Sequence, residues 1–251
     1  MFKTLLARAR QRHRTLAYPA EQPYMPPLFR GRPVLDAGKC AAGCTTCRDV
    51  CPAEAIKLML EGPRIDLGRC IFCGDCSASC PENAIRFSRD WQLGATERSE
   101  LRIAGRDAPH IEALSQELRR LLGRSLRLRQ ISAGGCSGCE VEVNALGNIV
   151  FDASRFGIDF VASPRHADGV LITGPISQNM RAATLATYDA VAAPKLVIAA
   201  GACAISGGIF QGYEEVADGI EGLLPVDLYV PGCPPHPVTI LDGLLRLLGR
   251  L

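Results

Sequence analysis

The chain contains twelve cysteines, and their spacing divides them into three groups of four. Two groups are tandem runs that each end in Cys-Pro, and the third is scattered over the second half of the chain. Since four thiolates hold one cubane cluster, the count predicts three 4Fe–4S clusters, enough for an electron relay. The groups are Cys40, Cys44, Cys47 and Cys51; Cys70, Cys73, Cys76 and Cys80; and Cys136, Cys139, Cys203 and Cys233.

The second run fits the bacterial ferredoxin pattern C-x2-C-x2-C-x3-C-P, in which the fourth cysteine of each run ligates the other cluster. The first run has one extra residue between Cys40 and Cys44. Zinc is the alternative, because C-x2-C pairs also build zinc sites, but two runs that both end in Cys-Pro favour iron–sulfur. The crossover rule predicts one cluster on Cys40, Cys44, Cys47 and Cys80, and another on Cys70, Cys73, Cys76 and Cys51.

Residues 36–90 contain an internal repeat with an offset of 29 positions. The segment that starts at Cys51, Cys-Pro-Ala-Glu-Ala-Ile-Lys-Leu, matches the segment Cys-Pro-Glu-Asn-Ala-Ile-Arg-Phe that starts at Cys80. Duplication of a short cluster-binding unit is typical of a two-cluster ferredoxin. The repeat therefore predicts one α+β ferredoxin-like dicluster domain.

The four scattered cysteines follow the expected strands of a parallel sheet. Short apolar strands at 126–131, 158–162, 170–173, 196–200 and 228–230 alternate with helices at 140–146, 180–192 and 238–248, and a further helix is expected over 107–123. This alternation predicts an α/β, flavodoxin-like, doubly wound parallel sheet. Ligands bind beyond the carboxyl ends of such strands, where all four cysteines fall. The alternative is four separate buried structural thiols.

Three other residues are candidates for the surroundings of the third cluster. Arg165 and His166 follow the second strand and could tune the cluster by hydrogen bonding, although they could equally be surface loop residues. Glu140 and Glu142 open the helix after Cys139, where an acidic side chain suits the helix dipole. A proton-transfer role for either glutamate is a second interpretation.

The bulk composition limits the compartment and the class of partner. A net charge of +2 gives no case for nucleic acid. An even cysteine count would suit disulfides in a secreted protein, but the first residues lack the apolar stretch of a signal peptide, so we expect reduced thiols in the cytoplasm. Residues 1–17 carry five basic side chains and no acidic one, with apolar residues at helical spacing. This basic amphipathic segment could lie on a membrane, dock on a partner, or be a solvated terminus.

The second half of the chain resembles the small iron–sulfur subunit shared by respiratory complex I and energy-converting NiFe-hydrogenases. The resemblance rests on Ser163-Pro-Arg-His-Ala-Asp, on Gly201-Ala-Cys-Ala, and on the stretch from Pro225 to the Pro-Gly-Cys-Pro-Pro around Cys233. Residues 1–90 resemble the two-cluster ferredoxin subunit of the same complexes, with Tyr18-Pro19 and Phe29-Arg30-Gly31 ahead of the first cysteine run. In that family the four scattered cysteines bind the cluster nearest the active site.

The resemblance implies an electron-transfer subunit of an oxidoreductase complex, with no complete catalytic centre on this chain. The first pair, Cys136-x2-Cys139, and His166 resemble the formate hydrogenlyase type, whereas complex I subunits have adjacent cysteines at that pair. The implied partners are a NiFe-hydrogenase-like large subunit, membrane subunits, and an upstream donor such as a formate dehydrogenase-type subunit or ferredoxin. The implied location is the cytoplasmic face of the inner membrane. The alternatives are a complex I-like quinone oxidoreductase subunit and a stand-alone ferredoxin fused to a binding module.

Four segments follow from these observations. We expect a basic amphipathic segment and arm over 1–35, the dicluster domain over 36–90, a linker and helix over 91–124, and the α/β domain over 125–251.

Overall fold

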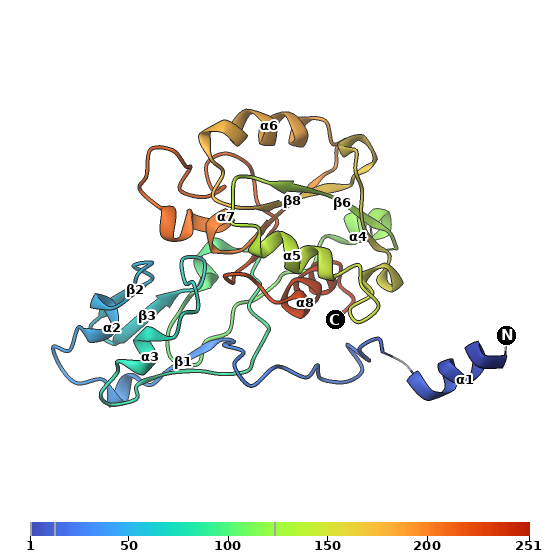
Figure 1. Cartoon of the computed structure of the whole chain (residues 1–251). Helices are drawn as coiled ribbons and strands as arrows, with labels where there is room; N and C mark the ends of the chain where they lie inside the picture. The colour runs from blue at the N-terminus through green and yellow to red at the C-terminus, as the bar shows by residue number, and fades with distance from the viewer. Residues whose placement is uncertain (1, 13, 123) are drawn as a thin grey trace.

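The computed structural model describes residues 2–12, 14–122 and 124–251. These residues form one five-stranded parallel sheet and two smaller antiparallel sheets. We call residues 33–103, which hold the two small sheets, the ferredoxin unit, and residues 126–251, which hold the parallel sheet, the α/β unit. The two units lie side by side in Figure 1.

The parallel sheet has the strand order β10-β9-β8-β6-β7. Along the chain this order reverses between β6 and β8, which is consistent with a flavodoxin-like α/β domain. Strands β8, β9 and β10 are buried along their whole length, as expected for strands covered on both faces. The strands are β6 Leu126–Ser132, β7 Ile158–Phe160, β8 Gly169–Thr173, β9 Leu196–Ala200 and β10 Leu228–Val230.

Helices cover both faces of this sheet. Figure 1 shows α6 on one side and α5 and α8 on the other. The ends of each of these three helices differ by at most three residues from the ends that the periodicity predicts. The short helix α7 was not predicted. The helices are α5 Gly138–Ala145, α6 Gln178–Asp189, α7 Ala202–Ser206 and α8 Pro237–Leu247.

The ferredoxin unit repeats its structure as its sequence does. The short helices α2 and α3 lie 29 positions apart, and each follows two cysteines of its run. Strand β1 pairs with β4, while β2 and β3 form a hairpin that β5 extends. Strand β5 comes from the stretch predicted to be a linker. The elements are β1 Pro33–Leu35, α2 Thr46–Asp49, β2 Ile56–Met59, β3 Gly62–Asp66, α3 Asp75–Ala78, β4 Ile85–Phe87 and β5 Arg102–Ile103.

Buried apolar side chains join the two units. One hydrophobic cluster extends from Ile65 in β3 through Leu101 to Ile205 in α7 and Tyr229 in β10. Backbone hydrogen bonds reinforce it, because Ala95 and Tyr229 each donate an N–H to the other's carbonyl, at 3.0 and 2.8 Å. The ferredoxin unit therefore shares a core with the α/β unit.

The prediction of a helix over 107–123 is wrong for the first half of that range. The structure has only α4, Gln116–Leu122, and Gly123, which was predicted to end the helix, lies outside the described residues. The preceding backbone N–H groups bond to distant partners, as when Leu114 N donates to Leu247 O at 2.8 Å and Glu112 N to Thr96 Oγ1 at 3.1 Å. These contacts replace the local bonds of a helix, so tertiary packing overrides the periodicity.

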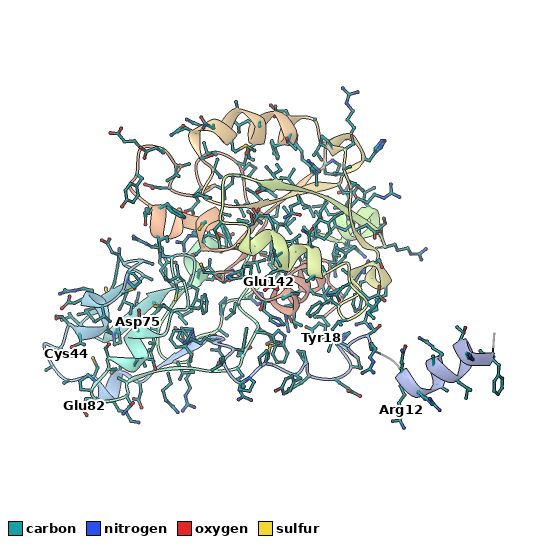
Figure 2. The ribbon with its side chains drawn as sticks, viewed as in Figure 1. Arg12, Tyr18, Cys44, Asp75, Glu82 and Glu142 are labelled. Atoms are coloured by element: carbon teal, nitrogen blue, oxygen red, sulfur yellow. The ribbon has the colours of Figure 1, made fainter. Side chains whose placement is uncertain are left out.

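The remaining helix, α1 (Phe2–Gln11), stands clear of both units in Figure 1. An arm that includes Tyr18 follows it (Figure 2), and the Tyr18 hydroxyl bonds to Asp242 in α8. Among the described helices, none combines the length and the apolar character needed to cross a bilayer. The short 3-10 helices are η1 Ala37–Lys39, η2 Arg98–Leu101, η3 Ala153–Phe156, η4 Pro164–His166 and η5 Gly208–Phe210.

Candidate functional site

The first cavity of the ferredoxin unit brings together Cys40, Cys44, Cys47 and Cys80. About 330 Å³ of space without protein atoms lies here, counting the part that is open to solvent. Burial raises the pKa of Cys47, and the neighbouring thiols of Cys40, Cys44 and Cys80 raise it further. On the solvent side, hydrogen bonds with the hydroxyl and N–H groups of Thr46 lower the pKa of Cys44. The fourth thiol of this set comes from the second cysteine run.

The second cavity is lined by Cys51, Cys70, Cys73 and Cys76 and is similar in size, about 310 Å³. Burial is the main cause that raises the pKa of Cys70, and the thiols of the other three cysteines add to it. Burial likewise raises the pKa of Cys76 to about 12. Here the fourth thiol, Cys51, comes from the first run, so the two runs exchange their last cysteines in space.

Backbone N–H groups point at three of these sulfurs. Two of these N–H groups, those of Ala55 and Ala84, come from equivalent turns. The residues before them, Glu54 (φ 46°) and Asn83 (φ 51°), lie 29 positions apart and both have a left-handed backbone conformation. N–H donors near the sulfurs stabilise the negative charge of a thiolate-bound cluster. The bonds run from Ala55 N to Cys51 Sγ (3.3 Å), from Phe72 N to Cys70 Sγ (3.3 Å) and from Ala84 N to Cys80 Sγ (3.2 Å).

The third set gathers at the carboxyl ends of three strands. Cys136 lies in the loop between β6 and α5, and Cys139 lies in the first turn of α5. Cys203 lies in α7 after β9, and Cys233 follows β10. Burial raises the pKa of Cys139, and the thiols of Cys203, Cys233 and Cys136 raise it further. Burial also raises the pKa of Cys203 to about 11. Cys136 and Cys233 are exposed, so this set opens on the surface of the chain.

Gly201, which follows β9, makes room for the third set. Its φ of +94° lies in the left-handed region, and a Cβ at this position would come within 2.5 Å of Cys139 Sγ. Only glycine fits both conditions without a shift of the sulfur or the backbone. The Gly-Ala-Cys stretch thus explains how Cys139 and Cys203 approach one another.

The two cavities of the ferredoxin unit each offer four sulfur donors. Within residues 2–12, 14–122 and 124–251, no three His, Cys, Asp or Glu side chains are arranged to hold a single metal ion. A zinc site needs ligands at about 2.0–2.3 Å from one metal. A cubane also takes four thiolates, but it spreads them around a body of several irons and sulfides. The four-sulfur linings of these two cavities suit the donor set that a cubane takes.

A buried hydrogen bond joins the second set to the third. Ser206 Oγ, in the last turn of α7, donates to Gly68 O at 2.9 Å. Gly68 is two residues from Cys70, and Ser206 is three residues from Cys203. A Cβ on Gly68 would lie 2.7 Å from Ile205 Cγ2, so the loop backbone is pressed against α7. The second and third thiol sets are therefore held on packed, hydrogen-bonded elements.

The two candidate glutamates have different surroundings. Glu140 Oε1 accepts hydrogen bonds from Ser132 Oγ and Thr173 Oγ1, both at 2.7 Å. Burial pushes the pKa of Glu140 up, but these bonds outweigh it and hold that pKa below its usual value. Glu142 shares a cavity with Cys233, and burial raises its pKa. Glu142 is thus the glutamate whose proton is held more tightly.

Arg165 and His166 lie in η4, in the loop after β7. Both are outside the buried core, and within the described ranges neither side chain forms a hydrogen bond or an ion pair. Strand β7 is the edge strand next to β6, at the opposite end of the sheet from β10. Contact of these two residues with the third cluster stays a prediction.

The sequence patterns did not single out His236, which lines the same cavity as Cys233 and Glu142. Its Nδ1 accepts a hydrogen bond from Val238 N at 3.2 Å, so the ring caps α8. The ring also meets Phe29 and Phe151 edge-on, with centroids 5.5 and 5.9 Å away, and burial lowers its pKa. A histidine directly before a proline at a helix start is the signal that could have found the cap.

Two family models match separate parts of the chain. The 4Fe-4S dicluster domain matches residues 39–85, and the family "NADH ubiquinone oxidoreductase, 20 Kd subunit" matches residues 136–247. Together with the gathered thiols and the parallel sheet, these matches define the class of the protein as an iron–sulfur subunit of an oxidoreductase.

Curated relatives come from two kinds of complex. Formate hydrogenlyase subunit 7 of Escherichia coli (strain K12) is 43% identical over 141 residues, which cover 56% of this chain and 55% of the relative. The probable membrane-bound hydrogenase subunit mbhJ of Pyrococcus furiosus is 38% identical over 141 residues, 56% of this chain and 84% of the relative. An NADH-quinone oxidoreductase subunit of Citrifermentans bemidjiense is 45% identical over 117 residues, 47% of this chain and 68% of the relative.

The chain belongs to the family of the 20 kDa subunit of NADH–ubiquinone oxidoreductase, and it carries a 4Fe–4S dicluster domain fused ahead of that part. The resemblance inferred from the cysteine runs and strand-end loops is confirmed. A solved structure, that of the archaeal membrane-bound sulfane sulfur reductase, matches 53% of this chain and 73% of its own with 32% identity and a TM-score of 0.47. At that score the backbones overlap too little for a comparison of detail.

Proposed function

We propose that this chain relays electrons through three 4Fe–4S clusters to or from a NiFe centre on a partner large subunit. The complex would be a membrane-bound, energy-converting hydrogenase of the formate hydrogenlyase-like kind. The observation that carries this proposal is the gathering of all twelve thiols into three sets of four. Membership of a family found in hydrogenase and quinone oxidoreductase complexes supports it.

Each cluster takes one thiol set. When bound, the clusters supply one-electron carriers, and the chain itself holds, spaces and shields them. The proposed ligands are Cys40, Cys44, Cys47 and Cys80 for the first cluster, Cys70, Cys73, Cys76 and Cys51 for the second, and Cys136, Cys139, Cys203 and Cys233 for the third.

The positions of the thiol sets suggest which end of the relay meets the electron donor and which end meets the large subunit. Figure 2 shows Cys44 at the end of the ferredoxin unit that points away from Glu142 on α5. An upstream donor, a formate dehydrogenase-type subunit or a ferredoxin, would meet that end. The large subunit would cover the exposed Cys136 and Cys233. Arg165, His166 and Glu142 would face the third cluster or the subunit interface next to it.

Four segments divide these tasks. We assign an amphipathic segment and arm to 1–35, the dicluster domain to 36–90, a connecting stretch to 91–124 and the α/β domain to 125–251. The connecting stretch also supplies β5 to the ferredoxin unit. The complex would sit at the cytoplasmic face of the inner membrane.

The choice of hydrogen over quinone chemistry rests on the spacing of the first pair of the third set. Cys136 and Cys139 are separated by two residues, as in the hydrogenase type, whereas the complex I type has adjacent cysteines. His166 also matches the hydrogenase type. The second candidate is a complex I-like quinone oxidoreductase subunit that fuses the two iron–sulfur parts, which a relative at 45% identity supports.

Purification of the intact complex, with nickel measured beside iron, separates the two candidates. We expect nickel in the large subunit and hydrogen-dependent reduction of a viologen dye. In the same complex, Cys203→Ala should leave the nickel content unchanged and abolish dye reduction that must pass through this chain. A complex without nickel that reduces quinone would contradict the hydrogenase assignment and support the second candidate.

A further inference from the structure

Helix α1 presents an apolar stripe that nothing in the described chain covers. Every residue of the helix from Phe2 to Gln11 is exposed, and Phe2 and Leu5 expose 74% and 63% of their surface. A helix turns about 100° per residue, so positions 2, 5, 6 and 9 lie on one face. That face is made of Phe2, Leu5, Leu6 and Ala9.

Basic side chains border this stripe on both sides. The same rotation puts Lys3 and Arg10 along one edge of the apolar face and Arg8 along the other. Arg12 and Arg14 follow the helix, and residues 2–12 and 14–17 contain no acidic side chain. Long basic side chains beside an apolar stripe can bury their methylene groups while their charges reach lipid headgroups.

The arm fixes where this helix leaves the molecule. Thr15 Oγ1 donates to Ile149 O at 2.8 Å, and Leu16 N donates to Val150 O at 2.9 Å. Ile149 itself is 71% exposed. The root of α1 is therefore anchored to the α/β unit beside an exposed apolar side chain, and the helix extends from that edge (Figure 1).

We propose that α1 is a peripheral anchor that lies flat on an anionic lipid bilayer. A short amphipathic helix with a basic border binds such a surface through the combined burial of its apolar face and attraction to acidic headgroups. An acidic protein could bind this helix only in a groove with negative charge along both edges of the stripe. A bilayer of anionic lipids has negative charge on both sides of the helix, whatever direction the helix takes on its surface. This anchor goes beyond electron relay and does not depend on the number of clusters.

Flotation with lipid vesicles tests the anchor on the anaerobically purified, iron-loaded full chain. Phosphatidylcholine vesicles with about 30% phosphatidylglycerol should carry the chain upward, and pure phosphatidylcholine vesicles should carry at least about tenfold less. Leu6→Gln should weaken binding about tenfold, because it removes a leucine from the apolar face. Arg8→Gln and Arg10→Gln should each weaken it about fivefold.

Ala7→Gln is the matched control, since it adds the same side chain to the polar face and leaves the charge unchanged. It should bind within about twofold of the parent chain. Equal binding to both kinds of vesicle, or equal loss in Leu6→Gln and Ala7→Gln, would overturn the proposal. The proposal would also be overturned if the parent chain did not bind vesicles and the Leu6→Gln chain dissociated from the detergent-purified complex. That result would identify a protein partner for the helix instead. Iron content, measured in the same samples, reports separately on the clusters.

Discussion

Burial makes several of the cysteine thiols harder to ionise in the absence of iron. Burial raises the pKa of Cys70 and Cys139, raises that of Cys76 to about 12 and raises that of Cys203 to about 11. Cluster ligands must be deprotonated, so incorporation of iron displaces protons that these buried thiols hold tightly. A cationic group bound among these thiols would compensate for their burial.

The exchange of Cys51 and Cys80 between the runs gives a prediction at the scale of single ligands. Cys80→Ala and Cys44→Ala should each lower the iron content from about twelve to about eight atoms and remove the same electron paramagnetic resonance signal. Cys51→Ala should remove a different signal. If Cys80→Ala instead removed the signal lost in Cys73→Ala, the exchange would be wrong.

Gly201 gives a second prediction at this scale. Gly201→Ala places a Cβ 2.5 Å from Cys139 Sγ and strains a φ of +94°, so we expect loss of the third cluster's signal and of about four irons. Gly212→Ala is the matched control, because Gly212 has a φ of +83° but open space around the added Cβ. Gly212→Ala should lower the free energy of unfolding by about 1–2 kcal/mol and leave the iron content unchanged. Equal iron loss in both variants would mean that strain, and not the collision, is the cause.

At the scale of elements, the packing of α7 against the loop at Gly68 relates the second site to the third. Ser206→Ala removes the buried hydroxyl that donates to Gly68 O, and we expect about 1–2 kcal/mol of lost stability together with weaker magnetic coupling between two reduced clusters. Thr187→Ala is the control, since Thr187 Oγ1 donates to Ala183 O on the exposed side of α6. If the magnetic coupling were unchanged in Ser206→Ala, the contact between Ser206 and Gly68 would have no part in electron transfer between the two clusters.

The arm before β1 contains a buried contact that predicts a pH dependence. Tyr18 OH donates to Asp242 Oδ1 at 2.5 Å, and Arg246 pairs with the same carboxylate at 2.9 Å. Burial, then the bond to Asp242, raises the pKa of Tyr18 well above its usual value. A raised tyrosine pKa stabilises the fold fully below the unfolded value of about 10 and ceases to do so as the pH rises further.

Tyr18→Phe should therefore lower the urea midpoint at neutral pH, by a loss of about 1–3 kcal/mol of unfolding free energy. The difference from the parent chain should shrink above about pH 10, where the parent loses the contribution. Unfolding followed from neutral pH to strongly alkaline pH checks this. A difference that stays constant across that range would show that Tyr18 does not titrate as the buried contact requires.

The elements also show what the sequence could and could not predict. The five parallel strands and α5, α6 and α8 follow from apolar runs and periodicity, because burial on both faces leaves a strong pattern. Helix α7 was missed, since five residues between glycines give too short a pattern. The expected helix before α4 failed because Leu114 and its neighbours bond to distant backbone, which no local pattern reveals.

At the scale of the whole molecule, the cysteine spacing predicts which residues would hold the clusters, but only the fold shows which cysteines lie near one another. Cys136, Cys139, Cys203 and Cys233 meet only because β6, β9 and β10 end at the same edge of one sheet. The contact of Ser206 with Gly68 had no sequence signal, because the two residues are 138 positions apart and lie in different units. The shared core joins the two units, and in the proposed relay electrons would enter or leave the chain at the exposed third set.

The central claim is that this one chain holds three clusters, and its iron and acid-labile sulfide content tests that claim most directly. The chain should be purified anaerobically in its full length, with each metal and sulfide measured per polypeptide. We predict about twelve irons and about twelve sulfides, with no stoichiometric zinc. About eight irons with four reactive thiols left over would contradict the account, because the third set of cysteines would then be free.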